Sequence, residues 1–274
     1  MSGGGRRGWL RLADVMVATL LGFFVFAPLA VLVLLSLTEE WGRAFRGGLT
    51  LRWLLEVPNA FGAAIAHSVL IAGVTMAATL LMSAMVAYGV LTRRVHGPIL
   101  VDTLVMTPLT IPYIVLGLAL ILAFKAPPFR LHGTVWLLLI GHLMIAMPLG
   151  YRTTQAVMEA TDLSLVEAAR SLGASEWTAV RRVILPLIAP GLVAASLLAF
   201  VTSLQNYSLS FMIAPERYKL VPLEIFTYVF AETGAYSNYN LAAAVSLCMM
   251  LVLLSALGVV RWLTGQSWHE NINV

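Results

Sequence analysis

Residues Glu167–Pro186 read EAARSLGASEWTAVRRVILP, a polar, helix-forming segment between two long apolar runs. Ser164 can cap a first short helix, with Glu167 as its partner in a capping box. Gly173 can form a left-handed turn where that helix ends, and Ser175 can cap a second helix. Pro186 then falls in the first turn of the next apolar run, where its missing N–H costs nothing. We therefore expect a surface loop of two short helices that is suited to contact a partner.

The composition places the rest of the chain in a lipid bilayer. Of 274 residues, 60% are hydrophobic and 11% are charged, whereas soluble domains carry about 25% charged residues. A single soluble core cannot bury that much apolar surface. The formal charge of +4 comes without a basic cluster, so no nucleic-acid partner is expected. The single cysteine, Cys248, has no metal-ligand set around it, so we expect a small packing residue and no metal site.

Six segments are long and apolar enough to cross the bilayer, which takes about 20 apolar residues. They are residues 13–37, 61–91, 99–124, 134–156, 186–213 and 240–263. We therefore predict an all-α membrane protein with six transmembrane helices in one domain, 13–265, between tails at 1–12 and 266–274. Arginines beside the spans favour a cytoplasmic N-terminus. Six spans then place the C-terminus and the loop at residues 159–184 in the cytoplasm as well.

Energy for any transport has to come from another protein. The two lysines, Lys125 and Lys219, do not follow glycine, so the chain has no Walker A loop. No Asp or Glu lies at mid-depth in a span, which argues against proton or sodium coupling within the chain. His67 and His142 remain, and a histidine in a span is commonly a hydrogen-bonded packing residue. We expect no catalytic residue and no cofactor in this chain.

The loop has a recognisable spacing: Glu-Ala-Ala, three residues, Gly, nine residues, and Val-x-Leu-Pro. This spacing resembles the signature loop of the membrane subunits of bacterial ATP-binding-cassette importers, over about Thr50 to Leu263. The resemblance implies a coupling helix that docks into a cleft of a cytoplasmic ATPase subunit. A purely structural role, in which Glu167 only caps its own helix, remains an alternative. The implied coupling residues are Glu167, Ala168, Ala169, Arg170, Gly173 and Pro186.

Four further segments resemble the spermidine/putrescine permease branch of this binding-protein-dependent family: Ile111–Gly117, Gly141–Pro148, Leu220–Tyr228 and Asn240–Ser246. Polyamine permeases tend to carry acidic residues near the position of Gln205 and Asn206, where this chain has neutral amides. The substrate is therefore expected to be a small polar solute such as a polyamine, with an aminophosphonate, thiamine or ferric iron as alternatives. The same polar cluster is also compatible with a span that simply ends in the headgroup region. Candidate path residues are Gln205, Asn206, Tyr207, Tyr113 and His142.

The resemblance also implies the partners of the chain. Two cytoplasmic ATP-binding-cassette ATPase subunits would bind ATP and Mg. A second permease, homologous but not identical, would complete the path in the bacterial inner membrane. A periplasmic or lipid-anchored solute-binding protein would deliver the solute. Two other classes remain open, a stand-alone secondary transporter or channel and a membrane scaffold.

Overall fold

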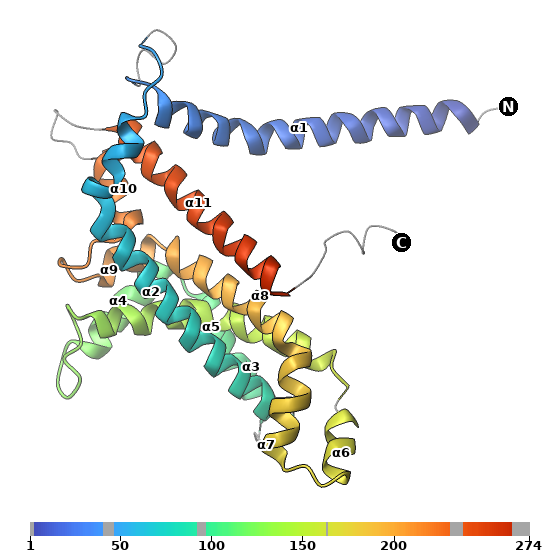
Figure 1. Cartoon of the computed structure of the whole chain (residues 1–274). Coiled ribbons are helices and arrows are strands. Elements are labelled where there is room, and N and C mark those ends of the chain that lie inside the picture. The colour runs from blue at the N-terminus through green and yellow to red at the C-terminus, as the bar shows by residue number, and fades with distance from the viewer. Residues whose placement is uncertain (1–2, 41–46, 92–96, 163, 231–237, 265–274) are drawn as a thin grey trace. The chain divides into compact units, whose positions relative to one another are not determined.

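The computed structural model describes residues 3–40, 47–91, 97–162, 164–230 and 238–264 (Figure 1). The described residues are helical except for connecting turns and one isolated bridge between Thr38 and Leu49. The long helices are α1 (Gly3–Leu37), α2 (Arg52–Leu91), α5 (Val135–Glu159), α8 (Leu185–Leu204) and α11 (Tyr239–Thr264). The shorter ones are α3 (Pro98–Met106), η2 (Thr107–Thr110), α4 (Tyr113–Phe124), α6 (Ser164–Ser171), α7 (Glu176–Ala179), η3 (Val180–Ile184), α9 (Ser208–Ile213) and α10 (Val221–Phe230).

Four of these helices, α1, α2, α5 and α11, are each long and apolar enough to cross a membrane. Two bent helix pairs raise the number of candidate spans to as many as six, which agrees with the prediction. α1 already includes residues 3–12, which were predicted to be a tail. The predicted tail at 266–274 lies outside the described residues.

The third predicted span, residues 99–124, is wrong as a single helix. The chain runs through α3 and η2, breaks at Ile111 and Pro112, and continues in α4 at an angle of 110°. Pro112 has no N–H to continue the helix, and its carbonyl accepts the first bond of α4, from Leu116 N at 3.0 Å. The span is therefore a broken pair rather than a kinked helix.

The fifth predicted span, residues 186–213, also differs from the structure. Its helix ends at Leu204, and α9 starts separately at Ser208. At its other end the helical run begins ten residues earlier, at Glu176, and bends by 62° between Ala189 and Gly191. The second span likewise begins early, because Arg52 N donates to Thr50 Oγ1 at 3.1 Å and starts α2 nine residues before residue 61.

The chain divides into two compact units, residues 1–61 with 225–251, and residues 62–224 with 252–274. In the first unit, Asn240 Nδ2 donates to the carbonyl oxygens of Leu35 and Thr38 at 2.8 and 2.9 Å. Trp53 Nε1 donates to the same Thr38 carbonyl at 2.9 Å. These bonds satisfy backbone acceptors that the end of α1 leaves open. They join the ends of three helices within this unit.

The second unit is built on the pairing of α5 with α8. Gly191 lets the two helices approach closely, since a Cβ on Gly191 would lie 2.7 Å from Cβ of Val157. Gly150 on α5 faces α2 in the same way, and a Cβ there would collide with Cγ2 of Thr79. Small residues of this kind allow close helix packing in membranes, where lipid removes the hydrophobic driving force between helices.

Candidate functional site

The loop after α5 has the two-helix form predicted for it, but a different residue caps its first helix. Ser164 N donates to Oδ1 of Asp162 at 2.9 Å, and Leu165 N to the Asp162 carbonyl at 3.3 Å. Asp162 therefore caps α6, and the predicted capping box of Ser164 with Glu167 is wrong because Ser164 is itself the first helical residue. The carboxylate also gains from the positive end of the helix dipole.

The turn between the two loop helices follows the prediction. Gly173 has φ +87°, a left-handed conformation that glycine adopts without steric cost. Gly173 N donates to Arg170 O at 2.9 Å and Ala174 N to Ala169 O at 3.1 Å, which is the Schellman pattern. Ser175 then caps α7, since its Oγ accepts from Thr178 N at 3.2 Å. The end of α6 and the start of α7 are thus both set by hydrogen bonds between residues that are close in the sequence.

Pro186 lies in the first turn of α8, as predicted, but this turn is not a free helix end. It follows η3, a π-helical segment that joins α7 to α8 without interruption. Leu185 N bonds to Val180 O, five residues back. A proline cannot donate to the carbonyl four residues before it and its ring crowds that group, here the carbonyl of Arg182. The widened turn accommodates this, and such π-bulges are frequent at functional sites.

α6 presents most of its side chains outward. Its Val166 packs against the buried cluster that includes Met147, Tyr151 and Ile188. Leu172 is 89% exposed and Trp177 is 71% exposed. Among the predicted coupling residues, Ala169 is half-buried, and Glu167, Ala168, Arg170, Gly173 and Pro186 are exposed. One face of α6, which carries Val166, therefore packs against the protein, and the other face, the open front of α6, is exposed.

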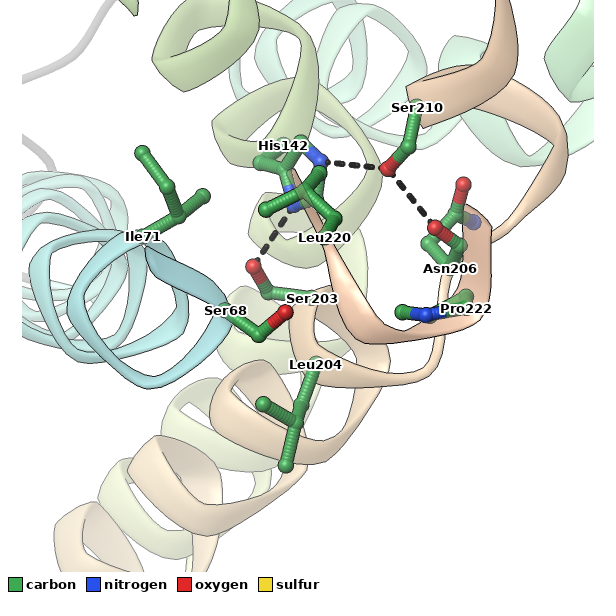
Figure 2. A pocket seen from close by; sticks show the side chains of 9 residues that line it. All are labelled: Ser68, Ile71, His142, Ser203, Leu204, Asn206, Ser210, Leu220 and Pro222. Atoms are coloured by element: carbon green, nitrogen blue, oxygen red, sulfur yellow. Dashed lines mark hydrogen bonds between the residues drawn. The ribbon is translucent and has the colours of Figure 1, made fainter. Parts of the chain in front are cut away.

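A second set of polar residues is buried around His142 on α5, which is 2% exposed (Figure 2). Its Nδ1 lies 2.7 Å from Ser203 Oγ at the end of α8, and its Nε2 lies 3.0 Å from Ser210 Oγ on α9. A cavity of about 10 Å³, on the scale of one water molecule, adjoins this group. It is lined by Ser68, Ile71, His142, Ser203, Leu204, Asn206, Ser210, Leu220 and Pro222.

The hydrogen bonds fix which imidazole nitrogen carries the proton. Ser210 Oγ donates its only proton to the Asn206 carbonyl at 2.7 Å, so it must accept from Nε2–H of His142. In neutral imidazole Nδ1 is then an acceptor and receives the hydroxyl proton of Ser203. One directed chain of bonds runs from α8 through α5 to α9.

The predicted path residues do not form one group. His142 and Asn206 line the small cavity, and Asn206 Oδ1 caps α9 by accepting from Leu209 N at 2.9 Å. Gln205 is exposed in the break between α8 and α9, and Tyr207 stacks on Phe211 with ring centroids 5.6 Å apart. Tyr113 begins α4 and packs half-buried against the core around Leu137.

Sequence reasoning missed two elements of this site. Ser68 Oγ on α2 accepts a hydrogen bond from Val221 N at 2.9 Å and so anchors the first residue of α10. The proline of the pair Val221–Pro222 is a helix-start signal that would have predicted α10. Asp102 and Arg152 form an ion pair at 2.9 Å between α3 and α5, which no spacing in the sequence indicates. Over the described residues, no three His, Cys, Asp or Glu side chains come together as metal ligands.

Comparison with known families decides the class. The model of the family "Binding-protein-dependent transport system inner membrane component" matches residues 96–266. The chain belongs to this family. It is a permease subunit of a binding-protein-dependent ABC importer and a multi-pass protein of the inner membrane. A permease of such a system implies ATPase and permease partners.

Relatives that are named as transport permeases align with most of this chain. The provisionally named 2-aminoethylphosphonate transport system permease protein PhnV of Salmonella typhimurium is 28% identical, over 91% of this chain and 92% of the relative. The spermidine/putrescine transport system permease protein PotC of Escherichia coli K12 is 26% identical, over 85% of this chain and 88% of the relative. The sequence identities of the two relatives to this chain are similar.

Solved structures share the fold of the permease. A chain of a bacterial ABC transporter that imports the acidic polysaccharide alginate has a TM-score of 0.67 at 15% identity, covering 94% of this chain and 97% of that one. A chain of a bacterial alginate ABC transporter, solved in complex with a periplasmic protein bound to an alginate pentasaccharide, has a TM-score of 0.69 at 18% identity, covering 94% and 96%.

Proposed function

We propose that this permease forms half of the translocation path of an ATP-driven importer and receives motion from an ATPase subunit through α6. The observation that carries the proposal is the open front of α6. Glu167 and Arg170 are exposed there, while Val166 on the back packs into the core. The adjacent small side chains of Ala168 and Ala169 allow a groove on a partner to approach the helix closely.

The connection from the loop into the membrane supports such a transmission. The turn at Gly173 ties α6 to α7, and α7 continues through η3 into α8, which bends by 62° between Ala189 and Gly191. α8 packs along α5, so displacement of the loop is passed to two spans. In this mechanism two ATPase subunits hold ATP and Mg, close on ATP binding, and move the loops of two permeases together. Hydrolysis returns them, and this chain binds neither ATP nor Mg.

The proposed complex has further parts. The second permease is a homologous, non-identical chain, and a periplasmic or lipid-anchored protein delivers the solute from outside. α6 and both termini of this chain then face the cytoplasm. The family match and the complex seen for the structural neighbour support this arrangement.

Substitution of Glu167 by Arg tests the coupling role. ATP-driven uptake should be lost in proteoliposomes of the assembled transporter, while membrane insertion and assembly with the ATPase subunits remain measurable. Glu159→Arg is the matched control, because it makes the same charge change at the exposed residue that ends α5, outside α6. Normal uptake by the Glu167 variant would exclude the coupling role. Uptake by the permease alone, without ATP, would instead favour a stand-alone transporter.

The proposed solute is small and polar and carries a protonated amine, as polyamines do. Spermidine, putrescine and 2-aminoethylphosphonate, the solutes in the names of the relatives, all carry amines. Gln205 is exposed and neutral, and we propose that it and Tyr207 contact the passing solute. His142 and Asn206 instead hold the break between α8 and α9, and Tyr113 sits at the break before α4.

Uptake of labelled putrescine, spermidine and 2-aminoethylphosphonate by host cells with and without the gene tests the solute class. Loss of polyamine uptake, restored by the gene on a plasmid, would establish a polyamine importer. Loss of 2-aminoethylphosphonate uptake alone would establish the same architecture with an aminophosphonate as solute. If none of the three changes, the amine proposal fails and thiamine and ferric iron chelates are the remaining solutes.

A further inference from the structure

The small cavity beside His142 lies among polar side chains that are almost fully buried. Its volume of about 10 Å³ is close to the space that one water molecule needs. Three of the hydroxyl groups around it, those of Ser68, Ser203 and Ser210, belong to residues that are at most 3% exposed. The cavity is therefore too small for a transported solute, and its hydroxyl groups have to find their hydrogen-bond partners inside the protein.

Ser68 is the residue of this group whose hydrogen bonds are incomplete. Its Oγ accepts from Val221 N at 2.9 Å, and a serine hydroxyl also has one proton to donate. Among the residues that the structure describes, no acceptor takes this proton. A buried donor without a partner is costly, so the site requires an acceptor next to Ser68.

Ser203 offers the other end of a bridge. Its only proton goes to Nδ1 of His142 at 2.7 Å, so its Oγ still has lone pairs that can accept. In Figure 2 the hydroxyl groups of Ser68 and Ser203 lie near one another beside the imidazole, and both residues line the cavity. No direct hydrogen bond joins these two hydroxyls in the part of the chain that the structure describes. Asn206 lines the cavity too, and its carbonyl, which accepts from Ser210, has a second lone pair.

We propose that one ordered water molecule occupies this cavity and bridges Ser68 to Ser203. The water accepts the hydroxyl proton of Ser68 and donates to Oγ of Ser203, and the carbonyl of Asn206 is available for its second proton. Three such bonds are typical of a buried water. A metal cation does not meet this need because it cannot accept a proton, and none of the described residues that line the cavity carries a carboxylate.

The water extends the directed chain of hydrogen bonds by one helix. The protein groups alone join Ser203 through His142 to Ser210, and with the water the chain begins at Ser68 on α2. Because Ser68 also anchors the first residue of α10, the break between α8 and α9 is then tied to two further helices. The inference depends neither on the coupling role of α6 nor on the identity of the solute.

A density map of the assembled transporter, at a resolution that shows ordered water, tests the site. The wild type should have a peak about 2.5–3.0 Å from both Ser68 Oγ and Ser203 Oγ, the usual range between hydrogen-bonded oxygen atoms. Ser68→Ala should remove the peak. Ser196→Ala is the matched control and should leave it, because the buried Ser196 on α8 donates to Val193 O at 2.7 Å within its own helix. A wild-type map with no such peak, or with the hydroxyls of Ser68 and Ser203 bonded directly, would overturn the proposal.

Thermal unfolding of the transporter in detergent gives a second test, which does not depend on a map. Ser68→Ala and Ser203→Ala should each lower the unfolding midpoint, and the double variant should lower it by less than the sum of the two shifts. Such non-additivity is expected because both hydroxyls hold the same water. The shifts of Ser68→Ala and Ser196→Ala should add, because these two residues share no partner. Additive shifts for Ser68→Ala and Ser203→Ala would contradict the bridge.

Discussion

His142 Nε2 lies 3.0 Å from Ser210 Oγ, and this bond joins the span α5 to the short helix α9 that follows a break in the chain. Because Ser210 gives its own proton to the carbonyl of Asn206, the bond also orients the imidazole. A buried side-chain network of this kind is stabilising only while each member has a partner. The geometry of the break at residues 205–207 therefore depends on one imidazole.

Replacement of His142 by Leu should destabilise the permease by about 1–3 kcal/mol, since it leaves the buried hydroxyl of Ser203 without its acceptor. Adding Ser203→Ala should recover part of this loss, because the unpaired hydroxyl is then removed. Thermal unfolding in detergent measures both effects. His67→Leu is the control, as His67 is only half-buried and its Nδ1 lies 3.3 Å from a backbone carbonyl. A His142 variant no less stable than this control would contradict the assigned network.

Gly191→Ala should destabilise the pairing of α5 with α8 by about 1–3 kcal/mol, the usual cost of overpacking. The added Cβ would meet the side chain of Val157, whose Cβ lies 2.7 Å away. The second substitution Val157→Ala should restore stability. Gly73→Ala in α2 provides the comparison, since nothing lies within 4 Å of its added Cβ, and it should be neutral or stabilising. Equal effects of the two alanines would refute the close contact.

Gly173→Val should reduce ATP-driven uptake while the protein still inserts. The residue has φ +87°, which costs an L-residue roughly 1–2 kcal/mol and a β-branched one more. Open space surrounds it, so the effect comes from the backbone and not from a clash. Gly173→Asn, which tolerates this conformation, should retain more uptake. Identical uptake by the Val and Asn variants would show that the turn does not need the left-handed conformation.

The start of α6 should loosen in acid. Hydrogen bonds to Asp162 from the backbone N–H of Ser164, and then from its side chain, lower the pKa of Asp162. Its folded-state pKa thus lies below the unfolded value of about 3.9. The ionised cap stabilises the loop at every pH above that value, and this stabilisation is lost as pH falls through the folded-state pKa. Hydrogen-exchange protection factors of α6 should decline there, and Asp162→Asn should remove the decline. A decline that persists in the Asn variant would assign it to another group.

Long apolar runs predict their helices well because a bilayer leaves the backbone no other way to satisfy its hydrogen bonds. The run at residues 13–37 is an example, and so is the one at 134–156. Local turn chemistry is also readable, as Gly173 and Ser175 show. Each of these depends on a few neighbouring residues, which the sequence displays directly.

The breaks are harder to predict because tertiary partners decide them. A proline such as Pro112 is compatible with a kink or with a complete break, and here η2 packs against α5 and the chain turns by 110°. The break after Leu204 depends on Asn206 capping α9 and on His142, which is sixty-four residues away from Asn206 in the sequence. Only the folded chain brings these groups together.

The π-helical turn at residues 180–184 holds one residue more than an α-helical turn between the same hydrogen-bonded groups. Returning it to α-helical winding would rotate the preceding segment by roughly 100° about the helix axis, the step of one residue. Trp177 would then point in a new direction while α8 stayed in register with α5. The π-helical turn thus allows the loop to rotate about the helix axis, while a displacement of the loop along that axis still reaches α8.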